Sequence, residues 1–229
     1  MVRESVLAVS SMFFCMAGVL SLHAQKASSI PEEIEWTWEV RPVKPDMNLP
    51  NVLLLGDSIT RNYFPEVKKD LAGMANVYLM ASSTCVGDPR LPGQIAEFGA
   101  MEHVQFAVVH FNNGMHGWEY SEAEYEKGFP TFLRSVQRLT GSHAKLIWAT
   151  TTPVRNDATG GATNPRIDAR NAIANALVTT QGIVIDDQHA LMEKHTNLHR
   201  DAVHFDDAGA TLQGDHAAEF VRNALRSAR

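Results

Sequence analysis

Cysteine is scarce in this chain of 229 residues, which has two, Cys15 and Cys85. Cys15 lies in an N-terminal segment that we expect to be removed, so Cys85 would stand alone in the mature protein. A lone cysteine cannot form an internal disulfide, and the apolar core must hold the fold together. No positive residue adjoins Cys85 in the sequence, so we expect a buried and inert thiol rather than a nucleophile.

An excess of positive charge is also missing. Twenty Lys and Arg residues against 26 Asp and Glu residues give a formal net charge of −6, and the two signs are interspersed. Because the chain has no stripe of basic residues that could follow a phosphate backbone, we do not expect nucleic acid as a partner. Hydrophobic residues make up 45% of the chain. At this length they are enough for one sizeable core, which predicts one domain.

The one long apolar run lies at the N-terminus. Residues 1–24 contain Arg3, an apolar stretch over 6–22, and Ala24 at a plausible cleavage point. This pattern predicts a signal peptide, a secreted or periplasmic protein, and no stable membrane association after cleavage. The alternative is an uncleaved membrane anchor, since the stretch is close to the shortest length that spans a bilayer.

Residues 25–50 are rich in Pro, Glu and Trp and show no clear period. They predict an extended arm ahead of the main domain, which we place at 51–229. We expect Trp36 and Trp38 to anchor this arm by burial on the domain surface. A binding role for the two tryptophans is the alternative.

The main domain alternates buried strands with helical stretches. Its first apolar run, Val52 to Leu55, ends in the polar turn Gly56-Asp57-Ser58. Similar runs recur at 77–80, 106–109, 146–149 and 183–185, and helical stretches at 65–71, 122–139, 164–179 and 208–228. This alternation predicts a three-layer α/β/α sandwich around a mainly parallel, flavodoxin-like sheet of about five strands. Ligand sites in such sheets lie outside the carboxyl ends of the strands.

Two polar segments carry the chemistry expected at that edge. Ser58 stands at the start of the first helix, where unpaired N–H groups and the helix dipole favour developing negative charge. A nucleophile and a simple helix cap fit this position about equally well. The run Asp201-Ala202-Val203-His204 places a carboxylate within reach of the imidazole Nδ1 and leaves Nε2 free to accept a serine proton. Together the segments predict a Ser-His-Asp triad.

The segments resemble blocks of the SGNH hydrolases, the GDSL-like lipases and esterases, from Val52 to the C-terminal helix. Leu55-Gly56-Asp57-Ser58-Ile59-Thr60 is similar to the nucleophile block, and Asp201-Ala202-Val203-His204-Phe205 is similar to the D-x-x-H block. The resemblance implies Ser58 as the nucleophile, with its own N–H in the oxyanion hole. It also implies His204 as the general base and Asp201 as its orienting carboxylate.

The two remaining blocks match less closely. The stretch H-F-N-N-G resembles the family's G-x-N-D block, with His110 and Asn113 in place of Gly and Asp, and it implies Asn112 as an oxyanion donor. A second main-chain donor should come from residues 81–88. Gly87 is our choice because glycine allows the closest backbone approach, and Ser83 is its competitor.

Asp57, Asn113 and His116 are further candidates for the pocket. The resemblance implies hydrolysis of carboxylic esters through an acyl-enzyme, with no metal and no cofactor. Secreted members without an apolar lid commonly act on glycans, so we expect a carbohydrate O-acetylesterase with a small-molecule or glycan ester substrate. A lysophospholipase, thioesterase or short-chain arylesterase with the same triad is the alternative.

Two other classes of function remain open on the sequence alone. A metal-dependent hydrolase could draw on a region dense in metal-ligating side chains: His189, His195, His199, Asp201, His204 and Asp206. A non-catalytic binding protein could have kept the fold and lost the chemistry. The absence of a G-x-S-x-G motif argues against the nucleophile elbow of the common α/β-hydrolases.

Overall fold

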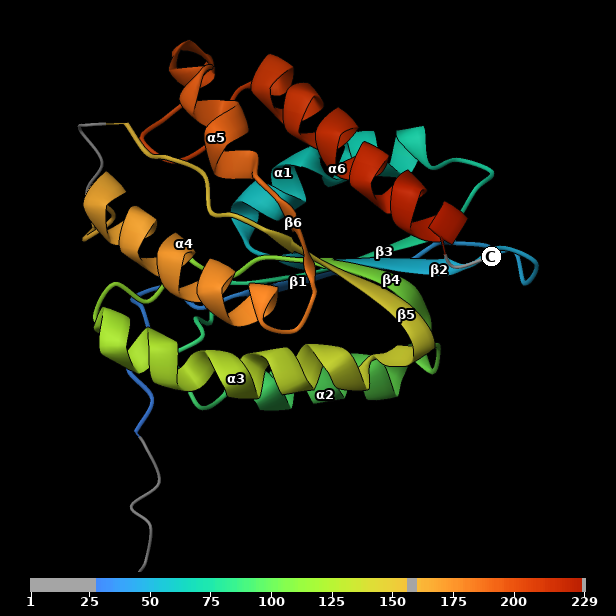
Figure 1. The fold of residues 1–229 in the computed structure, drawn as a ribbon, viewed down its shortest axis with the longest axis horizontal. Helices are drawn as coiled ribbons and strands as arrows, with labels where there is room; N and C mark the ends of the chain where they lie inside the picture. Colours follow the sequence, from blue (N-terminus) through green and yellow to red (C-terminus); the bar gives the residue numbers. More distant parts are fainter. Residues whose placement is uncertain (1–27, 156–159, 228–229) are drawn as a thin grey trace, which may run out of the picture.

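The computed structural model describes residues 28–155 and 160–227, so the predicted signal peptide lies outside the described residues. Six strands form one sheet in the order β1-β3-β2-β4-β5-β6 (Figure 1). Its strands are β1 (Thr37–Val40), β2 (Asn51–Gly56), β3 (Asn76–Ser82), β4 (Phe106–Phe111), β5 (Thr140–Ala149) and β6 (Val184–Asp186). All neighbours pair in parallel except β1, which is antiparallel to β3.

Helices cover both faces of the sheet (Figure 1). The helices are α1 (Ser58–Asp70), α2 (Leu91–Glu102), α3 (Glu122–Arg138), α4 (Asn164–Thr179), α5 (Gln188–Glu193) and α6 (Asp207–Ser227). Buried side chains of α1 and α6 pack on one face, those of α2 and α3 pack on the other, and α4 contributes to both cores. In the part of the chain that is described, no helix is both long and apolar enough to cross a membrane.

Both faces of the central strands are buried, which explains their continuous apolar sequences. In β2, Val52 and Leu54 belong to the core beneath α1 and α6, whereas Leu53 and Leu55 belong to the core beneath α2 and α3. A strand covered on both faces cannot alternate apolar with polar residues. The predicted three-layer sandwich with a mainly parallel sheet is therefore confirmed.

Three elements were not predicted: β1, α2 and the short helix α5. The strand β1 lies inside the segment expected to be an extended arm, and it adds a sixth, antiparallel strand at the sheet edge. The helix α2 was not predicted, because Pro92, Gly93 and Gly99 give it a weak intrinsic helix propensity. Its apolar face, with Ile95 and Phe98, packs into the core and provides the stabilisation that propensity does not.

The buried carboxylate of Asp186, on β6, is hydrogen-bonded to side chains of three other elements, β4, α5 and α6. Asp186 Oδ2 lies 2.7 Å from His110 Nε2 and accepts a hydrogen bond from Gln188 Nε2 at 3.0 Å, and Asp186 Oδ1 lies 2.7 Å from His216 Nδ1. Burial alone would raise the pKa of Asp186, but the hydrogen bonds from the two histidines outweigh it and hold that pKa well below its ordinary value. The pKa of His216 is raised, chiefly by its hydrogen bond to Asp186. An ionised network therefore joins β4, β6 and α6.

Replacing Asp186 with alanine should lower the free energy of unfolding by about 3 kcal/mol, because removal of one partner leaves buried polar atoms unpaired. Urea unfolding at neutral pH measures the loss. Asp168→Ala is the control, since the exposed Asp168 carboxylate lies 3.3 Å from His189 Nε2 and even an exposed ion pair contributes about 1 kcal/mol at most. Equal losses in the two variants would contradict the account.

The same network predicts how stability depends on pH. The raised pKa of His216 means that its contribution is fully present below the unfolded value and is lost as pH rises through the folded value. From about pH 6 to pH 9 the wild-type protein should therefore lose more stability than His216→Gln does. Urea unfolding at intervals across this range measures both slopes, and identical slopes would contradict the assignment.

Candidate active site

Ser58 is the first residue of α1, and Asp57 alone separates it from the end of β2 at Gly56. Asp57 is the helix cap, because its Oδ1 accepts a hydrogen bond from the Ile59 N–H at 2.9 Å. The capping role considered for Ser58 is thus filled by its neighbour. At the first helical position the Ser58 N–H has no acceptor within the helix, and the positive end of the helix dipole lies beside the hydroxyl.

The three side chains of the predicted triad are hydrogen-bonded in series. Ser58 Oγ lies 2.7 Å from His204 Nε2. On the other side of the ring, His204 Nδ1 lies 3.0 Å from Asp201 Oδ2 and 3.1 Å from Asp201 Oδ1. This arrangement orients the imidazole so that Nε2 can take the proton of the hydroxyl.

Asp201 is held by main-chain donors as well as by the imidazole. Its Oδ1 accepts the N–H groups of Val203 at 2.8 Å and His204 at 2.6 Å. Partial burial raises the pKa of Asp201, but these N–H groups and the His204 ring have the larger, opposite effect. The pKa is therefore lowered to about 2. The group is a carboxylate at neutral pH. Both side chains remain accessible to solvent, because 48% of the Asp201 side chain and 27% of the His204 side chain are exposed.

The loop that carries His204 is hydrogen-bonded to α1 and is also bridged internally, between His199 and Phe205. Asn62 Nδ2 donates to the Phe205 carbonyl at 3.0 Å, one turn along the helix from Ser58. His199 pairs with Phe205 in an isolated antiparallel bridge, and the centres of their rings lie 4.1 Å apart. These contacts fix the loop against the helix and so set the distance between the imidazole and the hydroxyl.

The side chains of Asn112 and Asn113, which follow β4, both form hydrogen bonds within the protein. Asn112 Nδ2 donates to the Ala149 carbonyl at 2.7 Å and to Thr151 Oγ1 at 3.0 Å, which uses both of its amide hydrogens. Its predicted role in the oxyanion hole therefore requires it to exchange one of these partners. Asn113 does not contribute to a pocket in this arrangement, because Nδ2 donates to the Thr84 carbonyl and Oδ1 accepts the Val86 N–H, both at 2.9 Å.

The loop after β3 offers a different main-chain donor from the one predicted. The Gly87 N–H faces the Cys85 thiol, and the Ser83 N–H donates to the Trp36 carbonyl at 3.1 Å. This geometry supports neither Gly87 nor Ser83 as the second oxyanion donor. The Cys85 N–H has no hydrogen-bond acceptor among the residues that the structure describes. The Cys85 side chain is buried, and burial raises the pKa of its thiol to about 11, as expected of an inert cysteine.

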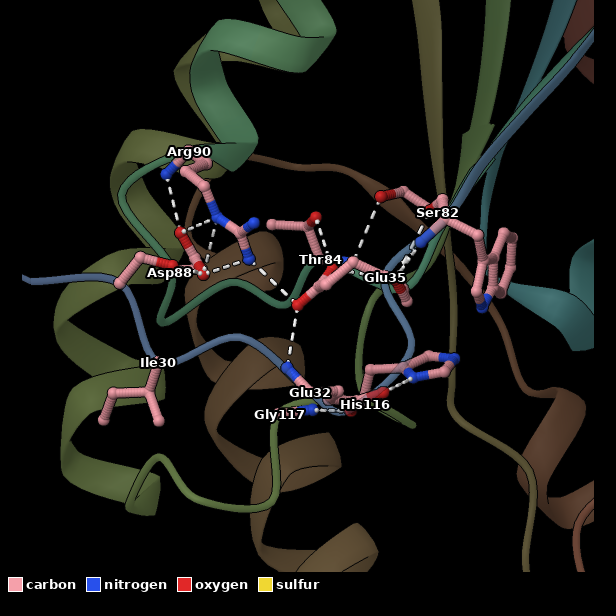
Figure 2. A network of polar contacts seen from close by, with 12 residues as sticks. Ile30, Glu32, Glu35, Ser82, Thr84, Asp88, Arg90, His116 and Gly117 are labelled. Carbon is pink, nitrogen blue, oxygen red and sulfur yellow. Dashed lines mark hydrogen bonds and ion pairs between the residues drawn. The ribbon is translucent and has the colours of Figure 1, made fainter.

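His116, a predicted pocket residue, is held by a side chain that the sequence did not single out. Glu32 of the arm places Oε2 at 2.9 Å from His116 Nδ1, and its Oε1 accepts the Gly117 N–H at 2.7 Å (Figure 2). Within the described residues, the buried His116 Nε2 has no partner. The charge of Asp57, next to the nucleophile, contributes to raising the pKa of His116, so the imidazole lies within electrostatic reach of the site.

Polar contacts, strand pairing and one of its two tryptophans fix the arm to the domain. Glu35 accepts hydrogen bonds from Ser83 Oγ and from Arg90 Nη2, each at 2.9 Å (Figure 2). The expectation that both rings are buried is wrong for Trp38, which is 52% exposed, while Trp36 is partly buried against the core.

The residues considered for a metal site do not converge. His189 pairs with Asp168, His199 Nε2 lies 3.1 Å from the Pro153 carbonyl, and Asp206 caps α6 through the Gly209 N–H. Among the described residues, one group brings three potential ligand atoms within 4.8 Å of one another, namely Glu66, Asp70 and Asp215 on α1 and α6. That group lies outside the region proposed from the sequence, and exposed acidic clusters are common without an ion.

Replacing Glu32 with glutamine should lower the pKa of His116. Burial lowers this pKa, but the hydrogen bond and charge of Glu32, with the charge of Asp57, raise it above the ordinary value. Titration of the His116 ring resonances by NMR measures the change. Glu33→Gln removes the same charge one residue away and should shift the pKa less, and equal shifts in the two variants would contradict the assigned contact.

Solved structures resemble this chain, although no protein-family model and no curated protein matches it. A carbohydrate esterase of family 3 from Talaromyces cellulolyticus is 16% identical at a TM-score of 0.60, and the match covers 78% of this chain and 99% of that one. A member of the lipolytic G-D-S-L family from Veillonella parvula is 17% identical at a TM-score of 0.60, with 75% and 98% covered. An acetyl-xylooligosaccharide esterase from Geobacillus is 15% identical at a TM-score of 0.61, with 78% and 96% covered. The chain has the fold of the SGNH hydrolases.

Proposed function

We propose that this protein is a serine hydrolase of carboxylic esters. The observation that carries the proposal is the hydrogen-bonded series from Ser58 Oγ through His204 to Asp201. As Ser58 Oγ forms a bond to the ester carbonyl carbon, His204 Nε2 takes its proton, and Asp201 stabilises the imidazolium that results. His204 then gives this proton to the departing alcohol, which leaves an acyl-enzyme. Water, deprotonated by His204, cleaves that intermediate and restores the Ser58 hydroxyl.

Charge that develops on the carbonyl oxygen needs donors placed in advance. The Ser58 N–H at the first turn of α1 is one such donor, and the helix dipole adds to its effect. We propose the Cys85 N–H as the second main-chain donor, since the other N–H groups of residues 83–87 face acceptors within the protein. The Asn112 amide becomes the third when it exchanges its bond to Thr151 for one to the oxyanion.

For the substrate we propose an acetyl ester on a carbohydrate. Two proteins with similar structures are described as a carbohydrate esterase and as an acetyl-xylooligosaccharide esterase. The exposed positions of Asp201 and His204 also favour a substrate that lies across the surface rather than one enclosed in a deep cavity. A thioesterase, lysophospholipase or short-chain arylesterase would use the same triad on another acyl group. The N-terminal apolar segment leads us to propose export, which fits a substrate outside the cell.

The test is release of acetate from acetylated xylan and acetylated pectin, beside hydrolysis of p-nitrophenyl esters of rising chain length, each measured with and without EDTA. We expect activity that is greatest with acetyl groups and survives EDTA. Ser58→Ala and His204→Ala should each lower kcat by about 1000-fold or more, because the two residues act as a unit. Ser135→Ala on α3 is the control serine and should retain full activity.

Different outcomes separate the parts of this proposal. Activity that tolerates Ser58→Ala would overturn the serine mechanism. Activity that depends on Ser58 but rises with acyl chain length would keep the mechanism and replace the acetyl substrate. Activity that EDTA abolishes would transfer the chemistry to a metal.

A further inference from the structure

One guanidinium near the nucleophile lies over the rings of two tryptophans of the arm. Arg61 Cζ lies 5.2 Å from the centre of the Trp36 ring and 5.1 Å from the centre of the Trp38 ring. A guanidinium stacks through its planar faces and keeps its N–H donors directed outward from its edge. Stacking on two rings therefore restricts the orientation of Arg61 without using those donors.

The position of Arg61 places this cation beside the predicted site. It lies three residues after Ser58 on α1, and residues at this spacing share one face of a helix. Side chains of a helix lean toward its N-terminus, so Arg61 extends toward the turn that carries Ser58. On the same flank, Trp36 meets the His116 ring edge-on, with ring centres 5.8 Å apart.

The charge of Arg61 has no counter-ion in the part of the chain that the structure describes. No carboxylate or carbonyl oxygen accepts a hydrogen bond from its guanidinium anywhere in residues 28–155 and 160–227, and the residue is exposed. Two other arginines of the chain differ in this respect. Arg90 is bound to Asp88 and Glu35, and Arg166 is bound to Glu122. An oriented but unpaired guanidinium in a chain with a net charge of −6 suits an anionic ligand.

We propose that Arg61, Trp36 and Trp38 form a subsite for a sugar that bears a carboxylate, so that the substrate is an acetylated acidic glycan. This inference rests on the proposed function and narrows its substrate class. Arg61 binds the carboxylate through two parallel N–H donors, the geometry that a guanidinium fork provides. The half-exposed Trp38 ring offers an apolar surface against which the sugar ring packs. The ester of the same or the next sugar then lies at Ser58.

Binding of unacetylated sugars tests the subsite without requiring catalysis. Isothermal titration calorimetry of the mature protein compares trigalacturonate with xylotriose, a neutral sugar of equal length. We expect trigalacturonate to bind about tenfold more tightly, since a hydrogen-bonded charge pair contributes at least that much. The advantage should shrink as salt rises from about 0.05 M to about 0.5 M, because exposed charges are screened.

Three variants separate the subsite from a general charge effect. Arg61→Gln should remove the tenfold preference for trigalacturonate, and Trp38→Ala should weaken the binding of trigalacturonate severalfold. Arg138→Gln removes the same charge from the end of α3 and should keep the preference. Equal affinities for the two sugars in the wild-type protein, or equal effects of Arg61→Gln and Arg138→Gln, would overturn the inference.

The two proposals fail in different ways. Release of acetate from acetylated xylan and pectin, with no preference for trigalacturonate in the binding experiment, would retain the esterase and reject the acidic subsite. A preference for trigalacturonate that depends on Arg61, with no acetate released from any glycan, would retain the subsite and reject the proposed reaction.

Discussion

The hydrogen bond between Ser58 and His204 joins two residues that are 146 positions apart in the sequence. It forms only if β2, α1 and the loop before α6 are placed correctly relative to one another. The parallel sheet provides this placement, because Ser58 follows β2, at which the strand order reverses between β3 and β4. The bond from Asn62 to the Phe205 carbonyl then fixes the loop to α1. The geometry of the site therefore depends on the topology of the sheet together with the hydrogen bond from Asn62 to Phe205.

The arm completes this site from outside the main domain. Glu32 orients His116, Glu35 binds the loop after β3, and β1 adds a strand to the sheet edge. In consequence Trp36 and Trp38 stand beside α1 and orient Arg61. The arm carries no residue of the triad, yet it forms the flank of the site on which a substrate would lie. Its charged contacts, the pairing of β1 with β3 and the partly buried Trp36 attach it to the domain.

Local sequence predicted the parts of the fold that local physics determines. Five of the six strands and the positions of Ser58, Asp201 and His204 follow from apolar runs, a strand-to-helix turn and a short spacing, although β6 is less buried than its apolar run indicates. The strand β1 and the helix α2 could not be predicted in the same way, since contacts distant in sequence outweigh their weak propensities. The same limit applies to the donors of the site. Which N–H of residues 82–87 is unpaired depends on Trp36 and Asn113, which lie far away along the chain.

The measurement that tests the central claim most directly is covalent labelling with a fluorophosphonate, followed by intact mass and peptide mapping of the adduct. The account predicts one equivalent of label on Ser58, because His204 activates that hydroxyl, and no label on the Ser58→Ala variant. A label on Cys85 or on another serine would contradict the account. An unlabelled wild-type protein would contradict it as well, since a hydroxyl 2.7 Å from an oriented imidazole should react.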